Sequence, residues 1–141
     1  MSDTYINNAG LWQECIDLCW TARNECQKSL FTHCFEKGGK YLERNHVRIM
    51  MDCSEICRTT ADSLTHRSPV YAAICAATAA ICEACAESCD QLDTETMRQV
   101  GAHCRAAAKA CHTLGIGGEG DETITLPPPV EKEFAAATAS R

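Results

Sequence analysis

Hydrophobic and polar positions alternate at steps of three and four residues over most of the chain, which is the period of one face of an α-helix. No segment shows the two-residue alternation of a strand. The pattern predicts helices over residues 8–36, 40–66, 69–91 and 94–114.

The breaks between these segments contain residues that end or begin helices. The Gly38-Gly39 pair ends the first, and Ser68-Pro69 supplies an N-cap and a first-turn proline for the third. Asp93 or Thr94 can cap the fourth. Because the connections are short, successive helices should be antiparallel neighbours. We expect an all-α, antiparallel, up-down-up-down four-helix bundle over residues 1–114.

Residues 115–141 differ in composition and form a predicted C-terminal tail. Gly115, Gly117, Gly118 and Gly120 should end the last helix, and the run Pro127-Pro128-Pro129 favours extended polyproline II. A flexible tail is the favoured interpretation. The alternative is a docking peptide anchored by three apolar side chains, Leu126, Val130 and Phe134.

The positions that should face the bundle axis are mostly thiols, where Leu and Ile are usual. Eleven of the twelve cysteines fall on the four stripes, and only Cys34 lies one residue off. We expect a Cys-lined core in which these eleven are metal ligands: Cys15, Cys19, Cys26, Cys53, Cys57, Cys75, Cys82, Cys85, Cys89, Cys104 and Cys111.

Composition narrows the function classes. Hydrophobic residues reach 45% only because Ala and Cys are counted, so a conventional core would be thin. The net charge of −6 argues against a nucleic-acid partner and provides no polybasic membrane anchor. The N-terminus has no secretory signal, and no stretch approaches a membrane span. We therefore expect a cytoplasmic protein whose thiols stay reduced.

The cysteines have three possible roles: small hydrophobes of the core, disulfide partners or metal ligands. Buried Cys can act as a small hydrophobe, but eleven on one seam exceed that need. Cysteines seven apart on a helix are separated by ~10.5 Å along the axis, beyond disulfide reach. Cross-helix disulfides remain open, although a reducing compartment disfavours them. Soft thiolates suit Cu(I), Zn(II) or iron–sulfur clusters, and a ladder rather than isolated sets of four favours several Cu(I) ions.

Because successive helices should be antiparallel, the axis-facing stripes of the four helices meet at two ends of the bundle, and these ends differ in composition. One end collects imidazole and thioether groups, which also bind copper, from His33, His46, Met50 and Met97. The other end collects Asn8, Trp12, Leu64, Tyr71 and Leu114, most of them bulky. We expect metal to enter and leave at the His/Met end. Three further histidines, His66, His103 and His112, are weaker candidates.

The run from Cys75 to Cys89 resembles the four-helix-bundle copper storage proteins, as do the Asp52–Cys57 run, the Ser68-Pro69 turn, and His103-Cys104 with Cys111. The similarity covers roughly residues 10–114. It implies a cytosolic bundle that holds many Cu(I) ions, often as a homotetramer. Where richer members carry Cys, this chain has Ala22, His46, Met50, Thr78 and Ala107, which implies lower capacity or separate ion clusters.

The leading hypothesis is a non-enzymatic, cytosolic Cu(I) storage or buffering protein, with copper ions and a copper chaperone as candidate partners. The alternative is an iron–sulfur electron carrier, in which Cys82, Cys85 and Cys89 act with Cys53 or Cys57. A redox enzyme or thiol sensor is the weakest hypothesis. It requires an exposed cysteine of low pKa, for which Cys34 is the candidate.

Overall fold

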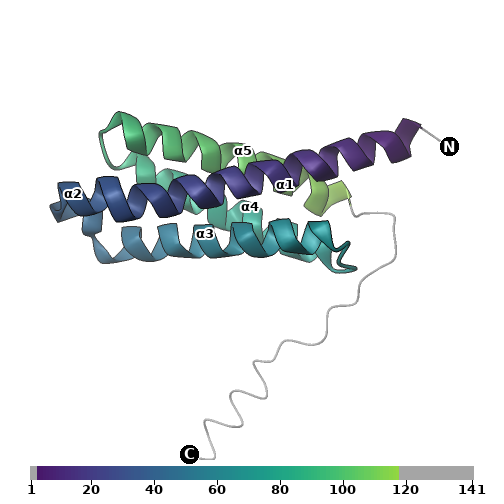
Figure 1. The fold of residues 1–141 in the computed structure, drawn as a ribbon, viewed down its shortest axis with the longest axis horizontal. Coiled ribbons are helices and arrows are strands. Elements are labelled where there is room, and N and C mark those ends of the chain that lie inside the picture. The colour runs from purple at the N-terminus through teal and green to yellow at the C-terminus, as the bar shows by residue number, and fades with distance from the viewer. Residues whose placement is uncertain (1–2, 118–141) are drawn as a thin grey trace, which may run out of the picture.

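The computed structural model describes residues 3–117, which form four long helices lying side by side (Figure 1). The elements are α1 (Asp3–Ser29), a π-helical turn η1 (Leu30–Cys34), α2 (Phe35–Lys37), a 3-10 turn η2 (Gly39–Leu42), α3 (Arg44–Thr65), α4 (Tyr71–Asp90) and α5 (Glu95–Gly117). Residues 118–141, with the proposed tail anchors, lie outside the described residues.

The helices pack as a square. Helix α1 lies against α3 and α5, and α4 lies against the same two partners, so α1 and α4 are diagonal neighbours across the axis. This arrangement confirms the predicted all-α, antiparallel four-helix bundle.

Side chains at the helix starts fix the register. Glu43 caps α3, where its carboxylate accepts from the backbone N–H groups of Asn45 and His46 at 3.0 and 3.2 Å. The expected start at Lys40 is wrong, because that stretch forms the 3-10 turn. Thr94 precedes α5 as predicted, and its hydroxyl accepts from Met97 N at 3.3 Å.

The predicted end of the last helix is also wrong. Helix α5 continues through Gly115 to Gly117. A Cβ atom on Gly115 would lie 3.2 Å from the backbone nitrogen of Ala76 in α4. Glycine is therefore used here for close helix packing, and not as a terminator.

The π-helical turn at Leu30–Cys34 changes the register of the first helix. A π turn inserts about one extra residue into an α-helix. Residues after it rotate by roughly one position relative to an unbroken α-helix, so Cys34 turns inward and becomes fully buried. The expectation that Cys34 lies off the seam is wrong for this reason.

The core consists mainly of sulfur and small side chains. All twelve cysteines are free and buried. Larger buried side chains lie toward the ends of the bundle: Leu30, Met50, Leu64, Met97 and Val100. The interior therefore offers soft ligands along most of its length.

One end of the bundle is closed by an aromatic group. The indole N–H of Trp12 donates to the carbonyl of Leu64 at 2.7 Å. The Trp12 ring lies 4.3 Å from that of Tyr71, centroid to centroid, and the Arg67 guanidinium lies over it at 5.0 Å. The predicted plug is present, although Asn8 has no described side chain.

Helix α4 is long and apolar enough, by length and composition alone, to cross a membrane. The expectation that no stretch approaches this limit is wrong for α4, because Ala and Cys raise its hydropathy. Its cysteines are buried inside the bundle. A core helix can meet the same criterion, so this is weak support for a membrane role.

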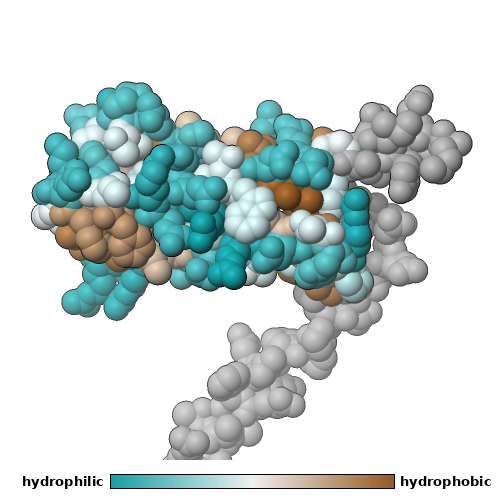
Figure 2. All heavy atoms as spheres, in the orientation of Figure 1, coloured by the Kyte–Doolittle hydropathy of each residue, from teal (hydrophilic) through white to brown (hydrophobic). Residues whose placement is uncertain are grey.

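The face shown in Figure 2 is mostly hydrophilic, with one apolar patch toward the end where α2 lies and another toward the opposite end. Phe31 and Phe35 are about half exposed at that end of the bundle, with ring centroids 5.2 Å apart.

Trp12→Phe tests the plug. The substitution retains a ring but removes the hydrogen bond to Leu64, so the free energy of unfolding of the protein should fall by about 1 kcal/mol. Urea denaturation measures this loss. Trp20→Phe is the matched control, because the indole of Trp20, also in α1, makes no hydrogen bond to the described residues. Equal losses in the two variants would argue against the role of the bond.

Candidate metal centre

Side chains of the four long helices bring the cysteine sulfurs into contact along the bundle axis. Near the plugged end, the Sγ atom of Cys111 lies 3.5 Å from that of Cys15 and 3.6 Å from that of Cys19. These three sulfurs lie within 4.8 Å of one another. Cys75 of α4 is also fully buried, and interaction with the thiols of Cys111 and Cys15 shifts its pKa, so it lies beside this first group.

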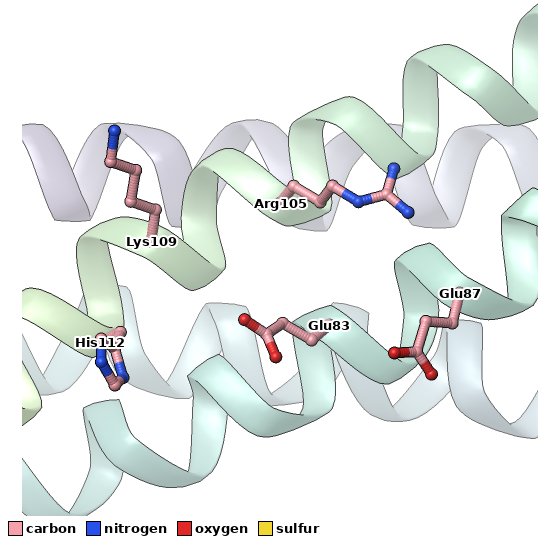
Figure 3. Close-up of a pocket in the computed structure, with 5 residues that line it drawn as sticks. All are labelled: Glu83, Glu87, Arg105, Lys109 and His112. Carbon is pink, nitrogen blue, oxygen red and sulfur yellow. The ribbon is translucent and has the colours of Figure 1, made fainter.

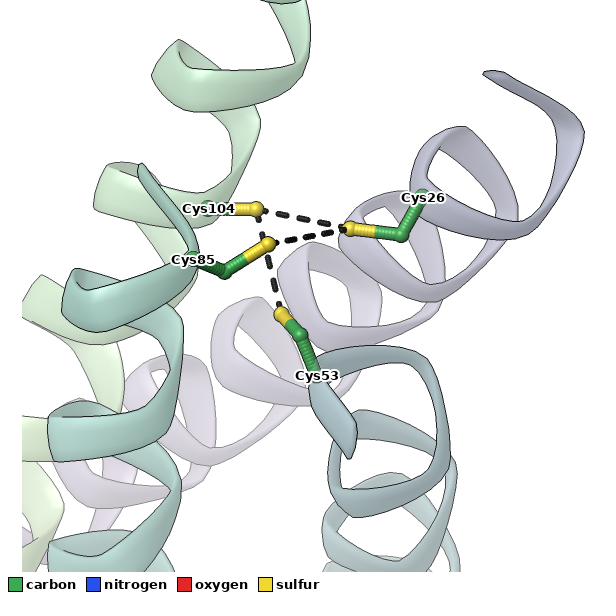
Figure 4. A group of neighbouring side chains, drawn as sticks. All are labelled: Cys26, Cys53, Cys85 and Cys104. Carbon is green, nitrogen blue, oxygen red and sulfur yellow. Dashed lines mark hydrogen bonds between the residues drawn. The ribbon is translucent and has the colours of Figure 1, made fainter. Parts of the chain in front are cut away.

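A second group consists of four thiols, one from each long helix (Figure 4). The Sγ atom of Cys26 lies 3.5 Å from that of Cys104 and 3.9 Å from that of Cys85. Cys53 lies 3.8 Å from Cys104, again between sulfurs. All four sulfurs are within 4.8 Å of one another, and all four residues are buried. We refer to this set as the quartet.

A third group shares one member with the quartet. The Sγ atom of Cys82 lies 3.7 Å from that of Cys53 and 3.4 Å from that of Cys57. Cys89, one helical turn beyond Cys85 on α4, is also fully buried. Nine of the eleven predicted thiols belong to these groups, and Cys75 and Cys89 are fully buried as well; we refer to the eleven as the column.

Between the first and third groups, several positions on the bundle axis have no sulfur. Ala22 and Ala107 occupy buried positions there, and the hydroxyls of Thr60 and Thr78 lie 2.6 Å apart. The Cys19 thiol of the first group is nonetheless the largest contributor to the raised pKa of Cys57.

The thiols influence one another's protonation. Hydrogen bonds from neighbouring thiols, chiefly Cys104, lower the pKa of Cys53. The Cys104 thiol is likewise the main cause of the raised pKa of Cys85, to which burial adds. Most members of the column should hold their protons until a cation replaces them.

The other end of the bundle contains three different soft ligands in a buried cluster. The Sγ atom of Cys34 lies 3.8 Å from Nε2 of His46 and 4.0 Å from Sδ of Met97. Nδ1 of His46 lies 2.7 Å from the hydroxyl of Ser88, in hydrogen-bond contact. When Nδ1 donates, the Nε2 lone pair is directed at Cys34. We refer to Cys34, His46 and Met97 as the mouth cluster.

The two other predicted ligands at this end differ in position. Met50 is fully buried. His33 is only partly buried, because the π turn rotates it away from the axis, and its Nε2 lies 3.0 Å from the hydroxyl of Thr94. The structure therefore brings Cys34, rather than His33, to the mouth cluster.

Sequence reasoning missed Cys34, although a signal was present. Cys26, Leu30 and Cys34 repeat at steps of four, and all three are buried. The apolar Leu30 was a better guide to the buried stripe than His33, which is only partly buried.

A separate pocket of about 370 Å³ lies on the outer surface between α4 and α5. Glu83 and Glu87 of α4 line it together with Arg105, Lys109 and His112 of α5, and the Lys109 side chain extends away from the two carboxylates in Figure 3. Arg105 also pairs with Asp90. The pocket is lined by charged side chains and contains no thiol.

A bundle with sulfur from all four helices along its axis defines a helical metal-binding protein of the cysteine-rich class. A family model for copper storage proteins matches residues 8–115. The chain therefore belongs to the copper storage protein family, and the expected storage function is confirmed at that level.

One curated relative and two solved structures illustrate the similarity. The uncharacterized cysteine-rich protein YhjQ of Bacillus subtilis (strain 168) is 36% identical over 101 residues, covering 72% of this chain and 82% of its own. The Nmul_A1745 protein of Nitrosospira multiformis has a TM-score of 0.74 at 37% identity, covering 77% and 97%. The Cu(I)-bound copper storage protein BsCsp3 has a TM-score of 0.70 at 26% identity, covering 74% and 98%.

The position of Cys34 predicts low reactivity. Burial, followed by the charge of Cys89, raises the pKa of Cys34 from the ordinary 9.0 to about 11. Its thiolate should be about 100-fold scarcer at pH 8 than that of an ordinary cysteine. Alkylation of the folded, copper-free protein, mapped by mass spectrometry, should leave Cys34 unlabelled, and labelling in denaturant is the control. Preferential labelling of Cys34 would support the thiol-sensor hypothesis.

Burial lowers the pKa of His46, with the nearby Glu43 carboxylate opposing the shift. The unfolded chain then binds a proton more readily than the folded chain once the pH falls below about 6.5. The free energy of unfolding of the copper-free protein should decrease from that pH down to the lower pKa of folded His46. Urea denaturation across this range should show a smaller decrease in His46→Gln, and an identical decrease would contradict the assignment.

Proposed function

We propose that this protein stores Cu(I) in the cytoplasm by binding several ions through cysteine thiolates inside the bundle. One observation carries the proposal: the buried sulfurs form a nearly continuous column with many neighbours 3.4–3.9 Å apart. Cu(I) accepts two or three thiolates and tolerates bridging ones, so adjacent ions can share sulfurs along such a column. The eleven column cysteines are the proposed ligands.

Charge supports a monovalent cargo. Each thiol that binds a metal loses its proton, and a buried thiolate is costly unless a cation offsets it. Several Cu⁺ ions can compensate thiolate charge along the column more evenly than one highly charged ion could. Copper binding should therefore stabilise the folded chain and weaken as acidity rises.

Metal uptake is proposed to occur at the mouth cluster. Cys34, His46 and Met97 offer thiol, imidazole and thioether atoms next to the column, and Met50 is buried on the same side. The opposite end is covered by Trp12 and its partners. A chain of soft ligands would let an ion move inward without returning to water. His33 is a candidate only as an outer contact.

The iron–sulfur alternative is less well supported by the thiol spacing. Its proposed ligands Cys82 and Cys85 belong to different sulfur groups. A cluster of several iron and sulfide ions requires its cysteine sulfurs further apart than a single ion does. Sulfurs within 4.8 Å of one another favour individual ions in contact with each of them.

Storage without catalysis, assembly as a homotetramer and delivery by a copper chaperone are further parts of the proposal. The first rests on the family, which is one of storage proteins. The exposed Phe31 and Phe35 rings near the mouth end supply apolar area that a partner or a second copy could cover.

Anaerobic titration of the copper-free protein tests the storage proposal. Cu(I) should bind in several equivalents, detected by competition with a chromophoric chelator. A purified protein that is brown and contains iron and sulfide would contradict it, as would saturation at one equivalent.

The direction of uptake has its own test. A His46→Ala/Met97→Leu double variant should take up Cu(I) several-fold more slowly than the parent, because two mouth ligands are lost. Stopped-flow absorbance in the thiolate–copper band measures the rate. Trp12→Ala is the control that opens the opposite end. If only Trp12→Ala changed the rate, metal would enter at the aromatic end.

A further inference from the structure

The quartet differs from the other sulfur groups in number and symmetry. Each long helix contributes one thiol, from Cys26, Cys53, Cys85 and Cys104 (Figure 4). The other two groups that the described residues form contain three sulfurs each. Four mutually close sulfurs on four helices can surround an ion completely, whereas three sulfurs leave one of its coordination positions open.

The sulfur separations match the edges of a tetrahedron around a single ion. Zinc binds thiolate at about 2.3 Å, so the sulfurs of a regular ZnS₄ site lie about 3.8 Å apart. The hydrogen-bonded pairs of the quartet are separated by 3.5, 3.8 and 3.9 Å. An ion at the centre would therefore require little movement of the helices.

The surroundings fit a closed site. All four residues are fully buried, and structural zinc sites exclude water by filling four positions with protein ligands. In the three-sulfur groups a tetrahedral ion would need a fourth ligand. Those groups suit Cu(I), with its lower coordination number.

We infer that the quartet is a tetrahedral site for one divalent d¹⁰ ion of the zinc class in the copper-free protein. Binding releases the thiol protons: Zn²⁺ and four R–SH groups give [Zn(SR)₄]²⁻ and four H⁺, with no change in oxidation state. The ion crosslinks the four long helices at one level of the bundle. It is distinct from the copper that the family stores, so the site does not depend on the proposed function.

Anaerobic titration of the reduced, copper-free full chain with Co²⁺, a coloured substitute for Zn²⁺, tests this site. One equivalent should produce the intense ligand-field absorption of a tetrahedral thiolate site, and added Zn²⁺ should abolish it. A wild-type endpoint other than one, or the weak spectrum of an octahedral ion, overturns the inference without reference to any variant.

Matched variants locate the ion. Cys85→Ser and Cys104→Ser remove quartet members that belong to no other group, and each should abolish the tetrahedral spectrum. Cys15→Ser, in the first group, and Cys75→Ser, which belongs to none of the three groups, should leave it unchanged. Circular dichroism and retained uptake of several Cu(I) equivalents establish that a variant is folded. A spectrum that survives in both quartet variants, or that disappears in the controls, refutes the assignment.

Discussion

The structure depends on packing twelve buried thiols around one axis without disulfide bonds between them. Free Cys is a small, soft hydrophobe with a weak S–H donor. The sulfurs here satisfy one another at 3.4–3.9 Å, and the hydroxyls of Thr60 and Thr78 pair in the same way. Such a core buries little aliphatic surface. The copper-free bundle should therefore draw much of its order from small-residue helix packing and from its closed ends, with metal binding adding further stability.

The two ends have different roles because their side chains differ in chemistry. Trp12, Tyr71 and Arg67 stack over one end and contribute area and a hydrogen bond, but no soft ligand. At the other end Cys34, His46 and Met97 place three kinds of soft ligand together under the Ser88 hydroxyl. A column with one inert end and one ligating end favours a single direction of metal movement.

Sequence periodicity was sufficient for the fold and for most of the column. Steps of three and four placed eleven cysteines on the correct faces, since α-helical geometry leaves little freedom there. The π turn was not predictable in this way, because it depends on packing at the end of α1. It buries Cys34 at the axis in place of His33. Gly115 was misread because its close approach to Ala76 is a tertiary contact. The division of the cysteines into three groups was also not predictable from the sequence, because it depends on distances between sulfurs of different helices.

Cys53 is shared between two sulfur groups, so it links zinc-type binding in the quartet to copper binding in the column. Its sulfur belongs both to the quartet and to the group with Cys57 and Cys82, so one thiolate cannot serve an independent ion in each. If a tetrahedral ion occupied the quartet, Cys53 would already be one of its ligands and would not be free to bind a second ion together with Cys57 and Cys82. Monovalent copper, which can share a bridging sulfur, avoids this conflict. Loading with copper should therefore reorganise the middle of the column as a unit, while the first group around Cys111 fills separately across the gap made by Ala22 and Ala107.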